Sequence, residues 1–148
     1  MKRKILIAVW HSGDKGKTES IRASAHALIS VRPMYKSLFP IPILIPPIGD
    51  FRMVVNVKGS IVAFESQGDP GTKLDLRLKD IESTYNPDVI ICSCRTRGET
   101  VQAIWSMSPN YEIIYTSTYD TNITAVHSSL NNLKGTHIID ILITMGII

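Results

Sequence analysis

The chain has 148 residues, of which 44% are apolar, and its 16 basic and 13 acidic residues give a formal net charge of +3. This length supports one buried core and is short for two ordinary domains, so we expect a single domain over residues 1–148. The mild charge contains no block of like charges and does not indicate nucleic-acid binding, and no apolar run approaches the roughly 18 residues that a membrane span needs.

Apolar runs and helical periods alternate along the first half of the chain. The run over 4–10 predicts a buried strand, and 17–31 has the spacing of a helix. The stretch SLFPIPILIPPIGDF contains four prolines, which cannot donate to a β-ladder, so it predicts an edge strand or an ordered extended segment. The two β-rich runs of MVVNVKGSIVAFE, separated by Lys58 and Gly59, predict a hairpin whose second strand enters the sheet.

The second half continues the alternation, which favours an α/β domain with a largely parallel sheet. DVIICSC is a continuous apolar run, typical of a strand buried on both faces. The segment over 136–148 predicts a helix, which we favour, or a last strand. The other expected elements are helices over 73–85 and 99–108, a strand over 112–119, and a helix from about 122 to 133 with Asp120 or Thr121 as its cap.

The loop between the first strand and the first helix carries the clearest functional pattern. It reads HSGDKGKT and ends at Thr18. A loop in this position points backbone N–H groups and a helix N-terminus at an anion, while Lys17 supplies charge and the Thr18 hydroxyl reaches Mg²⁺. A solvated lysine and a simple helix cap are the structural alternatives. Gly13 and Gly16 permit close backbone approach, whereas Asp14 brings a carboxylate to the place where phosphates would sit.

This loop and the strand that leads into ESQGDP together resemble the P-loop NTPase superfamily. The resemblance covers the βα order of most of the chain, and it implies a three-layer α/β fold with a mostly parallel sheet, helices on both faces and an antiparallel edge hairpin. In the GTPase-like branches an acidic residue opens a DxxG element. Here the element reads ExxG from Glu65 to Gly68, which implies that Glu65 or Asp69 holds the metal and that Gly68 senses the γ-phosphate. His11 replaces a consensus glycine, and Ser12 replaces the signature lysine of the septum-site and partitioning ATPases, so no branch is assigned.

The resemblance implies roles for further residues. Lys17 would neutralise the β- and γ-phosphates, and Gln67 would orient the attacking water. Arg95 and Arg97 follow a buried strand at its carboxyl end, where ligands bind in open α/β sheets, and they predict either a phosphate clamp or an exposed loop. The expected nucleotide-binding residues are Ser12, Gly13, Asp14, Lys15, Gly16, Lys17, Thr18, Glu19 and Gly68, and the expected metal ligands are Thr18, Glu65 and Asp69.

Two other patterns concern the core and the surface. Cys92 and Cys94 lie on the same face of the expected buried strand, and two thiols are too few ligands for a metal site. They predict reduced core thiols in a cytoplasmic protein. The run PIPILIPPI predicts either a surface for a protein partner or a second copy of the chain, or a buried edge.

These observations favour a Mg²⁺-dependent protein that binds ATP, or less favourably GTP, and hydrolyses it or transfers its γ-phosphoryl group. One alternative is a regulatory or partner-binding domain with little turnover, because His11, Asp14 and Glu65 depart from the consensus. Another is a small-molecule kinase in which Arg95 and Arg97 clamp phosphate. Guanine specificity has no support, because the sequence lacks a base-reading NKxD element.

Overall fold

The computed structural model describes residues 3–10 and 16–148. Strand and helix alternate along most of the chain, as the sequence predicts. In chain order the elements of the described residues are β1 (Ile5–Trp10), α1 (Lys17–Val31), β2 (Lys36–Phe39), β3 (Arg52–Val57), β4 (Ser60–Glu65), α2 (Leu74–Tyr85), β5 (Val89–Cys94), α3 (Glu99–Trp105), β6 (Glu112–Ser117), the 3₁₀ turn η1 (Thr124–Val126) and α4 (His127–Thr144).

The strands of the described residues form a six-stranded sheet in the order β2-β3-β4-β5-β1-β6. β1 pairs in parallel with β5 and β6, and β4 pairs in parallel with β5. β2, β3 and β4 are antiparallel neighbours, which confirms the mostly parallel sheet with an antiparallel hairpin at its edge. The four parallel strands end at one edge of the sheet, at Trp10, Glu65, Cys94 and Ser117.

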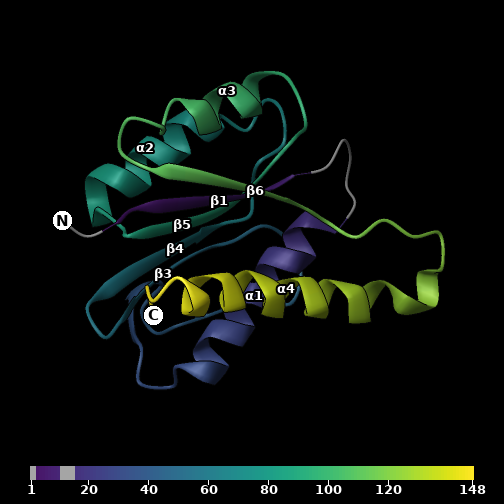
Figure 1. Cartoon of the computed structure of the whole chain (residues 1–148), viewed down its shortest axis with the longest axis horizontal. Coiled ribbons are helices and arrows are strands. Elements are labelled where there is room, and N and C mark those ends of the chain that lie inside the picture. The colour runs from purple at the N-terminus through teal and green to yellow at the C-terminus, as the bar shows by residue number, and fades with distance from the viewer. Residues whose placement is uncertain (1–2, 11–15) are drawn as a thin grey trace.

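Helices cover both faces of this sheet, with α2 and α3 above it and α1 and α4 below it in Figure 1. Successive side chains of a strand point to opposite faces. Ile7 and Ile91 therefore enter the core under α1 and α4, while Leu6 and Ile90 enter the core under α2 and α3. All six residues of β5 are buried, as expected for a continuous apolar strand in the middle of a sheet.

The C-terminal helix differs from the prediction. α4 continues through Gly135 to Thr144, so the expected boundary near 133 is wrong, and so is the alternative of a last strand. The reason lies in the packing of α4 against α1. A Cβ atom at Gly135 would lie 2.5 Å from the backbone carbon of Ala23. Glycine here permits the two helices to approach closely, and it does not end the helix.

The start of α4 also differs from the prediction. The connection from β6 turns through η1, and the residue before the first residue of α4 is Val126. Neither Asp120 nor Thr121 caps the helix. The Thr121 hydroxyl instead accepts a hydrogen bond from the Ile123 N–H at 3.1 Å, which stabilises the connection itself.

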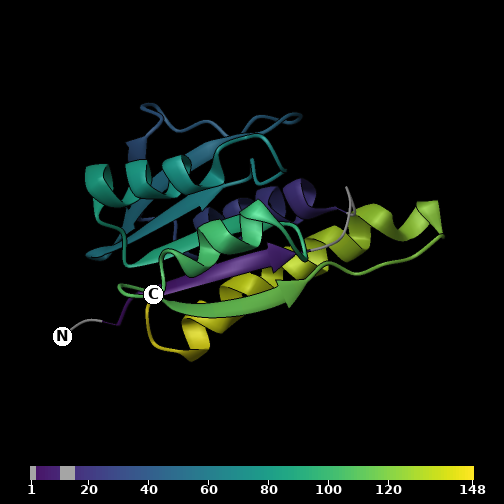
Figure 2. The same cartoon turned by 90° about the horizontal axis from the view of Figure 1, so that it is seen from above.

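The edge strand β2 ends just before the first proline, and it pairs with β3 through an irregularity between Ser37 and Phe39. The proline-rich segment over 40–50 follows as extended chain without a strand of its own. Figure 2 shows this blue segment along the edge of the molecule opposite β6. Both alternatives given for this stretch therefore occur, with an edge strand that ends at Phe39 and an extended segment after it.

Candidate functional site

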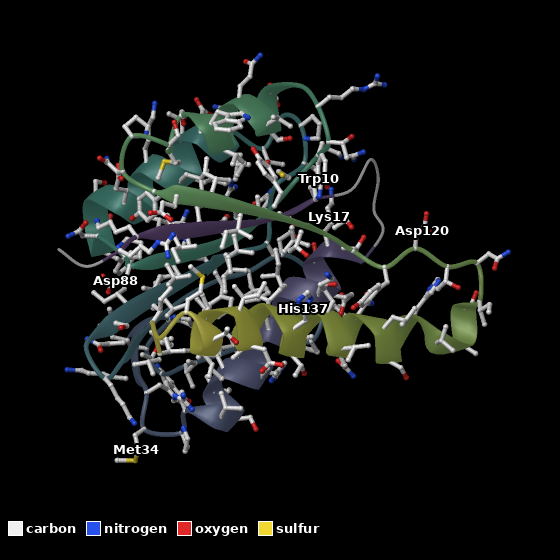
Figure 3. All side chains as sticks on the ribbon, in the orientation of Figure 1. Trp10, Lys17, Met34, Asp88, Asp120 and His137 are labelled. Atoms are coloured by element: carbon white, nitrogen blue, oxygen red, sulfur yellow. The ribbon has the colours of Figure 1, made fainter. Side chains whose placement is uncertain are left out.

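The side chain of Lys17 is almost fully buried although it opens a helix. The residue is only 4% exposed. Gly16, which has no side chain to cap the first turn of α1, precedes it as the N-cap with a φ of 76°. The positive end of the helix dipole and a buried ammonium therefore meet at the same place, and both favour an anion there. Figure 3 shows Lys17 at the end of α1 that lies toward the carboxyl end of β1, where Trp10 is labelled.

Asp69 contributes negative charge at this point. Its Oδ1 atom lies 3.3 Å from Lys17 Nζ and 3.2 Å from Arg95 Nε. The Asp69 side chain is 44% exposed, so this carboxylate keeps contact with water while it pairs with two cations. A pocket of about 180 Å³ opens here, and it is lined by Gly16, Lys17, Thr18, Glu19, Ser66, Asp69 and Ser93. We call this the phosphate pocket.

A second carboxylate approaches the phosphate pocket from the proline-rich segment. Asp50 Oδ1 accepts hydrogen bonds from the hydroxyls of Thr18, at 3.2 Å, and Ser66, at 3.0 Å. Ser66 follows β4 directly, and its Oγ accepts the Phe51 N–H at 2.8 Å. Three separated parts of the chain thus place two hydroxyls around one carboxylate oxygen.

Arg22 holds the proline-rich segment against α1. The residue is buried, its Nε donates to the Pro46 carbonyl at 2.7 Å, and its other nitrogens bind the Gly49 carbonyl and Glu19. The guanidinium also lies 5.7 Å from the centre of the Phe51 ring. These contacts fix the chain on both sides of residue 50, and they explain why its carboxylate reaches the start of α1.

Glu65 ends β4 as predicted, but its side chain lies on the face of the sheet that α2 covers. Its two oxygens accept hydrogen bonds from Arg52 Nε at 2.8 Å and from Arg77 Nη1 at 3.2 Å. Burial lowers the pKa of Arg52, but its bonds to Glu65 and Asp80 outweigh burial and raise that pKa. β5 also separates β4 from β1, a spacing of about 10 Å for two strand intervals. The structure does not bring Glu65 together with Thr18.

The other predicted site residues lie in the loops that follow β4 and β5, and the structure places only some of them near the phosphate pocket. Gly68 is packed so closely on β5 that a Cβ atom would lie 1.8 Å from the Ser93 carbonyl oxygen, so close approach alone explains the glycine. Gln67 is half-buried beside it. Arg95 joins the site through Asp69, whereas Arg97 is exposed on the loop before α3. Of the two arginines, the structure places only Arg95 against the phosphate pocket.

A second pocket, of about 230 Å³, lies next to the phosphate pocket and shares Gly16 with it. A Cβ atom on Gly16 would lie 2.5 Å from Asn131 Oδ1, so α4 closes tightly on the start of α1. Behind this second pocket, Lys134 Nζ lies 4.8 Å from the centre of the Tyr119 ring, and burial lowers the pKa of Lys134. The pocket is lined by Gly16, Tyr119, Asp120, Thr121, His127, Leu130 and Asn131, and we call it the lateral pocket.

Part of the predicted loop lies outside the described residues. The roles expected for Ser12, Gly13, Asp14 and Lys15, and the substitution at His11, therefore stay predictions. Of the loop and its immediate continuation, the structure places Gly16, Lys17, Thr18 and Glu19 at the phosphate pocket.

The two cysteines are buried core thiols, as predicted, on the face that α2 and α3 cover. Burial raises the pKa of Cys94 to about 11 even though the nearby Lys17 opposes this shift. Burial also raises the pKa of Cys92 well above its usual value. Both groups therefore remain neutral thiols at physiological pH, which suits packing rather than nucleophilic chemistry.

The oxygen atoms around the phosphate pocket suit a hard cation such as Mg²⁺ only together with phosphate oxygens from a bound molecule. Within the described part of the chain, no three His, Cys, Asp or Glu side chains are placed to hold a metal ion together. Thr18 and Asp69 line the pocket, and Asp50 adds a carboxylate oxygen that lies 3.2 Å from the Thr18 hydroxyl. Mg²⁺ typically takes one or two carboxylates and completes its shell with water and substrate phosphates. This donor set fits that pattern.

Sequence reasoning missed several residues of these pockets. No sequence pattern indicated Asp50, because it ends the proline-rich segment and its partner Thr18 is 32 positions away in the chain. Ser66 and Ser93 each lie at the end of an apolar strand, and that position is the one signal that pointed to them. His127 and Asn131 belong to a helix whose start was predicted elsewhere, so no spacing connected them with the loop.

Comparisons with protein-family models, with curated proteins and with solved structures find no match to this chain. Among the described residues, no helix has the length and apolar character required to cross a bilayer.

Proposed function

We propose that this chain is a Mg²⁺-dependent nucleotide-binding protein that holds the nucleotide's phosphates in the phosphate pocket. The proposal rests above all on one observation, the buried ammonium of Lys17 at the start of α1, directly after the glycine N-cap. Charge-assisted hydrogen bonds to phosphate and the N–H groups of a first helical turn act on the same anion. Gly16, Lys17 and Thr18 form the GKT sequence expected for such a site.

The phosphate pocket has room for phosphate groups but is too small for a whole nucleotide. Its volume of about 180 Å³ is below the 300–1,000 Å³ of most small-molecule pockets. The adjoining lateral pocket supplies a further 230 Å³, and an aromatic ring and amide and carboxylate groups line it. We assign the phosphates to the first pocket and the nucleoside to the second.

The metal would bind on the side of the phosphate pocket that carries Thr18, Asp50 and Asp69. Bound Mg²⁺ neutralises charge on the β- and γ-phosphates and orients them. Asp69 keeps water contact, and Asp50 is held by two hydroxyl donors that a cation can replace. Glu65 is left out of this ligand set, because two arginines engage both of its oxygens.

Hydrolysis or transfer of the γ-phosphoryl group is the reaction that such a site supports. Arg95 and Lys17 pair with the same oxygen of Asp69. Arg95 is therefore the better placed of the two predicted arginines to stabilise developing charge. A second function, nucleotide binding with little turnover, is favoured by Asp69, whose pairing with both cations must loosen before they serve phosphate oxygens. Phosphate release measured alongside binding separates the two.

A thermal-shift experiment tests the proposal. ATP, GTP and their diphosphates, each with and without Mg²⁺, should raise the melting temperature by mass action, and the triphosphates should act more strongly with Mg²⁺. D50N and D69N should reduce the Mg²⁺-dependent part of the shift, while K79A, which removes an exposed lysine of α2, should leave it unchanged. The absence of a shift with every nucleotide would contradict the proposal.

A further inference from the structure

Lys134 is a buried cation that faces an aromatic ring rather than a carboxylate. The residue is 5% exposed, and its Nζ donates to Thr116 Oγ1 at 2.9 Å and lies 3.5 Å from His137 Nδ1. The centre of the Tyr119 ring lies 4.8 Å from the same nitrogen. Among the described residues, no carboxylate forms an ion pair with Lys134. Because a buried ammonium needs polar partners, the ring is held in place as one of them.

Tyr119 carries this contact on the connection between β6 and α4. The residue is 43% exposed and lines the lateral pocket, whereas Lys134 does not line it. The ring therefore lies between the buried ammonium and the pocket. Figure 3 shows this connection, where Asp120 is labelled, extending past the start of α1 at Lys17. Tyr119 thus contributes accessible aromatic surface to a pocket that adjoins the phosphate site.

The ammonium behind the ring favours stacking on the side of the pocket. The face of an aromatic ring is negative, and two such faces repel one another when they stack. A cation on one face draws electron density from the other, so a ring that already binds a cation repels a second ring less. The contact with Lys134 also limits the rotation of Tyr119 before a ligand binds, which lowers the entropic cost of binding.

The place and lining of the lateral pocket suit a planar base. The pocket shares Gly16 with the phosphate pocket, so one ligand can extend from Lys17 to Tyr119. Leu130 adds an apolar side chain to the aromatic ring, and Asn131 adds an amide. Apolar and aromatic side chains with a few polar groups are typical of small-molecule pockets. A purine offers two fused rings to Tyr119 and a pyrimidine only one, so a purine gains more from stacking.

We propose that Tyr119 selects the base of the nucleotide by stacking on a purine ring in the lateral pocket, with Lys134 positioning the tyrosine. This inference rests on the proposed function, and it adds the residue that distinguishes nucleotides with the same phosphates. Tyr119 contacts the ligand, whereas Lys134 acts through Tyr119. The phosphate pocket then supplies the affinity that all nucleoside triphosphates share, and the lateral pocket supplies the preference for a purine.

Calorimetric titration of the full chain with Mg²⁺-ATP, Mg²⁺-UTP and Mg²⁺-tripolyphosphate tests the proposal. The parent should bind ATP about 5-fold or more tightly than UTP. Y119L should weaken ATP binding by about 10-fold, which is within the range of base–aromatic stacking, and leave tripolyphosphate binding unchanged. Y119F keeps the ring and should bind ATP as the parent does. The matched control F39L removes a ring of similar exposure, 42%, at the opposite edge of the sheet, and it should change none of these affinities.

Tripolyphosphate separates the failure of this inference from the failure of the proposed function. Equal affinities of the parent for ATP and UTP, or equal ATP affinities of Y119L and the parent, would overturn the stacked purine even while tripolyphosphate binds. No binding of any of the three ligands would overturn both proposals.

The positioning role of Lys134 has its own variant. K134M should reduce the preference for ATP over UTP and leave tripolyphosphate binding unchanged, because the ring loses the cation that holds it. An unchanged preference would show that Lys134 only packs against the ring. Melting temperatures near that of the parent show that the variants fold. Y119L and Y119F alter a half-exposed side chain, so they test the stacked purine even if K134M does not fold.

Discussion

Glu65 and Asp69 lie close together in the chain, but the structure gives their carboxylates opposite surroundings. The Glu65 side chain is 2% exposed, and an arginine binds each of its oxygens. The Asp69 side chain is 44% exposed and shares a single oxygen between Lys17 and Arg95. The first carboxylate completes a buried ion network, while the second pairs with two cations beside the phosphate pocket.

This difference separates a structural acid from a functional one. A buried, fully paired network rigidifies the fold, and removing one of its members leaves uncompensated charge. A half-exposed carboxylate beside a pocket contributes less to stability, and it exchanges partners at a lower cost than a buried one. Because both residues end or follow the same strand, their position in the sequence alone did not distinguish them.

The largest expected effect concerns the structural acid. E65Q should lower the free energy of unfolding by about 3 kcal/mol, because Arg52 and Arg77 lose a charged partner in a buried position. Urea denaturation measures this change. Nucleotide-induced thermal shifts should remain as in the parent. A variant of full stability that fails to respond to Mg²⁺ would instead make Glu65 a metal ligand, as the sequence first indicated.

A packing change on the other side of the sheet should have a somewhat smaller effect. G135A places a methyl group against the α1 backbone, where an ideal Cβ lies 2.5 Å from Ala23, so α1 and α4 must separate. We expect a loss of about 2 kcal/mol in the free energy of unfolding, which is typical of overpacking. Because α1 carries Lys17, nucleotide affinity should fall with it. Unchanged stability would show that the layer below the sheet is more plastic than the contact implies.

The functional acid should show the reverse pattern. D69N should lower the free energy of unfolding by about 1 kcal/mol, less than E65Q does, because the Asp69 carboxylate is 44% exposed even though the Lys17 ammonium that it pairs with is buried. It should weaken Mg²⁺-nucleotide binding by about 10-fold, which corresponds to roughly 1.4 kcal/mol. Chemical denaturation and calorimetry on the same preparation measure both quantities. A stability loss as large as that of E65Q would remove the distinction between the two carboxylates.

The smallest expected effect is a pH dependence that arises on the Glu65 side of the sheet. Cys94 has a pKa of about 11 in the folded chain, and an unfolded thiol titrates near 8.5. Between these values the folded state holds a proton that the unfolded state has lost, so stability is full below about pH 8.5 and falls as pH rises toward 11. C94A should therefore lose about 1 kcal/mol less than the parent between pH 8.5 and 9.5. Parallel stability curves for the two proteins would contradict this.

Much of the fold followed from the sequence because its strands are continuous apolar runs. Val89–Cys94 and Ile5–Trp10 were predicted almost to the residue, because short continuous apolar runs are typical of strands buried on both faces. The helix boundary expected near 133 was wrong, because α4 continues through Gly135 and packs there directly against α1. That contact between distant residues has no local pattern in the sequence.

The site was predictable where it is local and unpredictable where it depends on distant contacts. Lys17 and Thr18 were found from the order of strand, loop and helix. The contribution of Asp50 depends on Arg22, which binds carbonyls of the segment at Pro46 and Gly49, and no local pattern encodes that arrangement. Alternation along β4 does place Glu65 on the same face as Ala63, but its arginine partners come from tertiary structure.

Calorimetric titration of Mg²⁺-ATP and Mg²⁺-GTP into the parent, K17A and the exposed-lysine control K79A tests the central claim most directly. The parent and K79A should bind at least one of the two nucleotides, and K17A should bind it at least about 100-fold more weakly, because a buried charge-assisted contact is lost. Arg95 still pairs with Asp69 in K17A, so the variant should keep the fold. Equal affinity of K17A and the parent would contradict the assignment of the phosphate pocket.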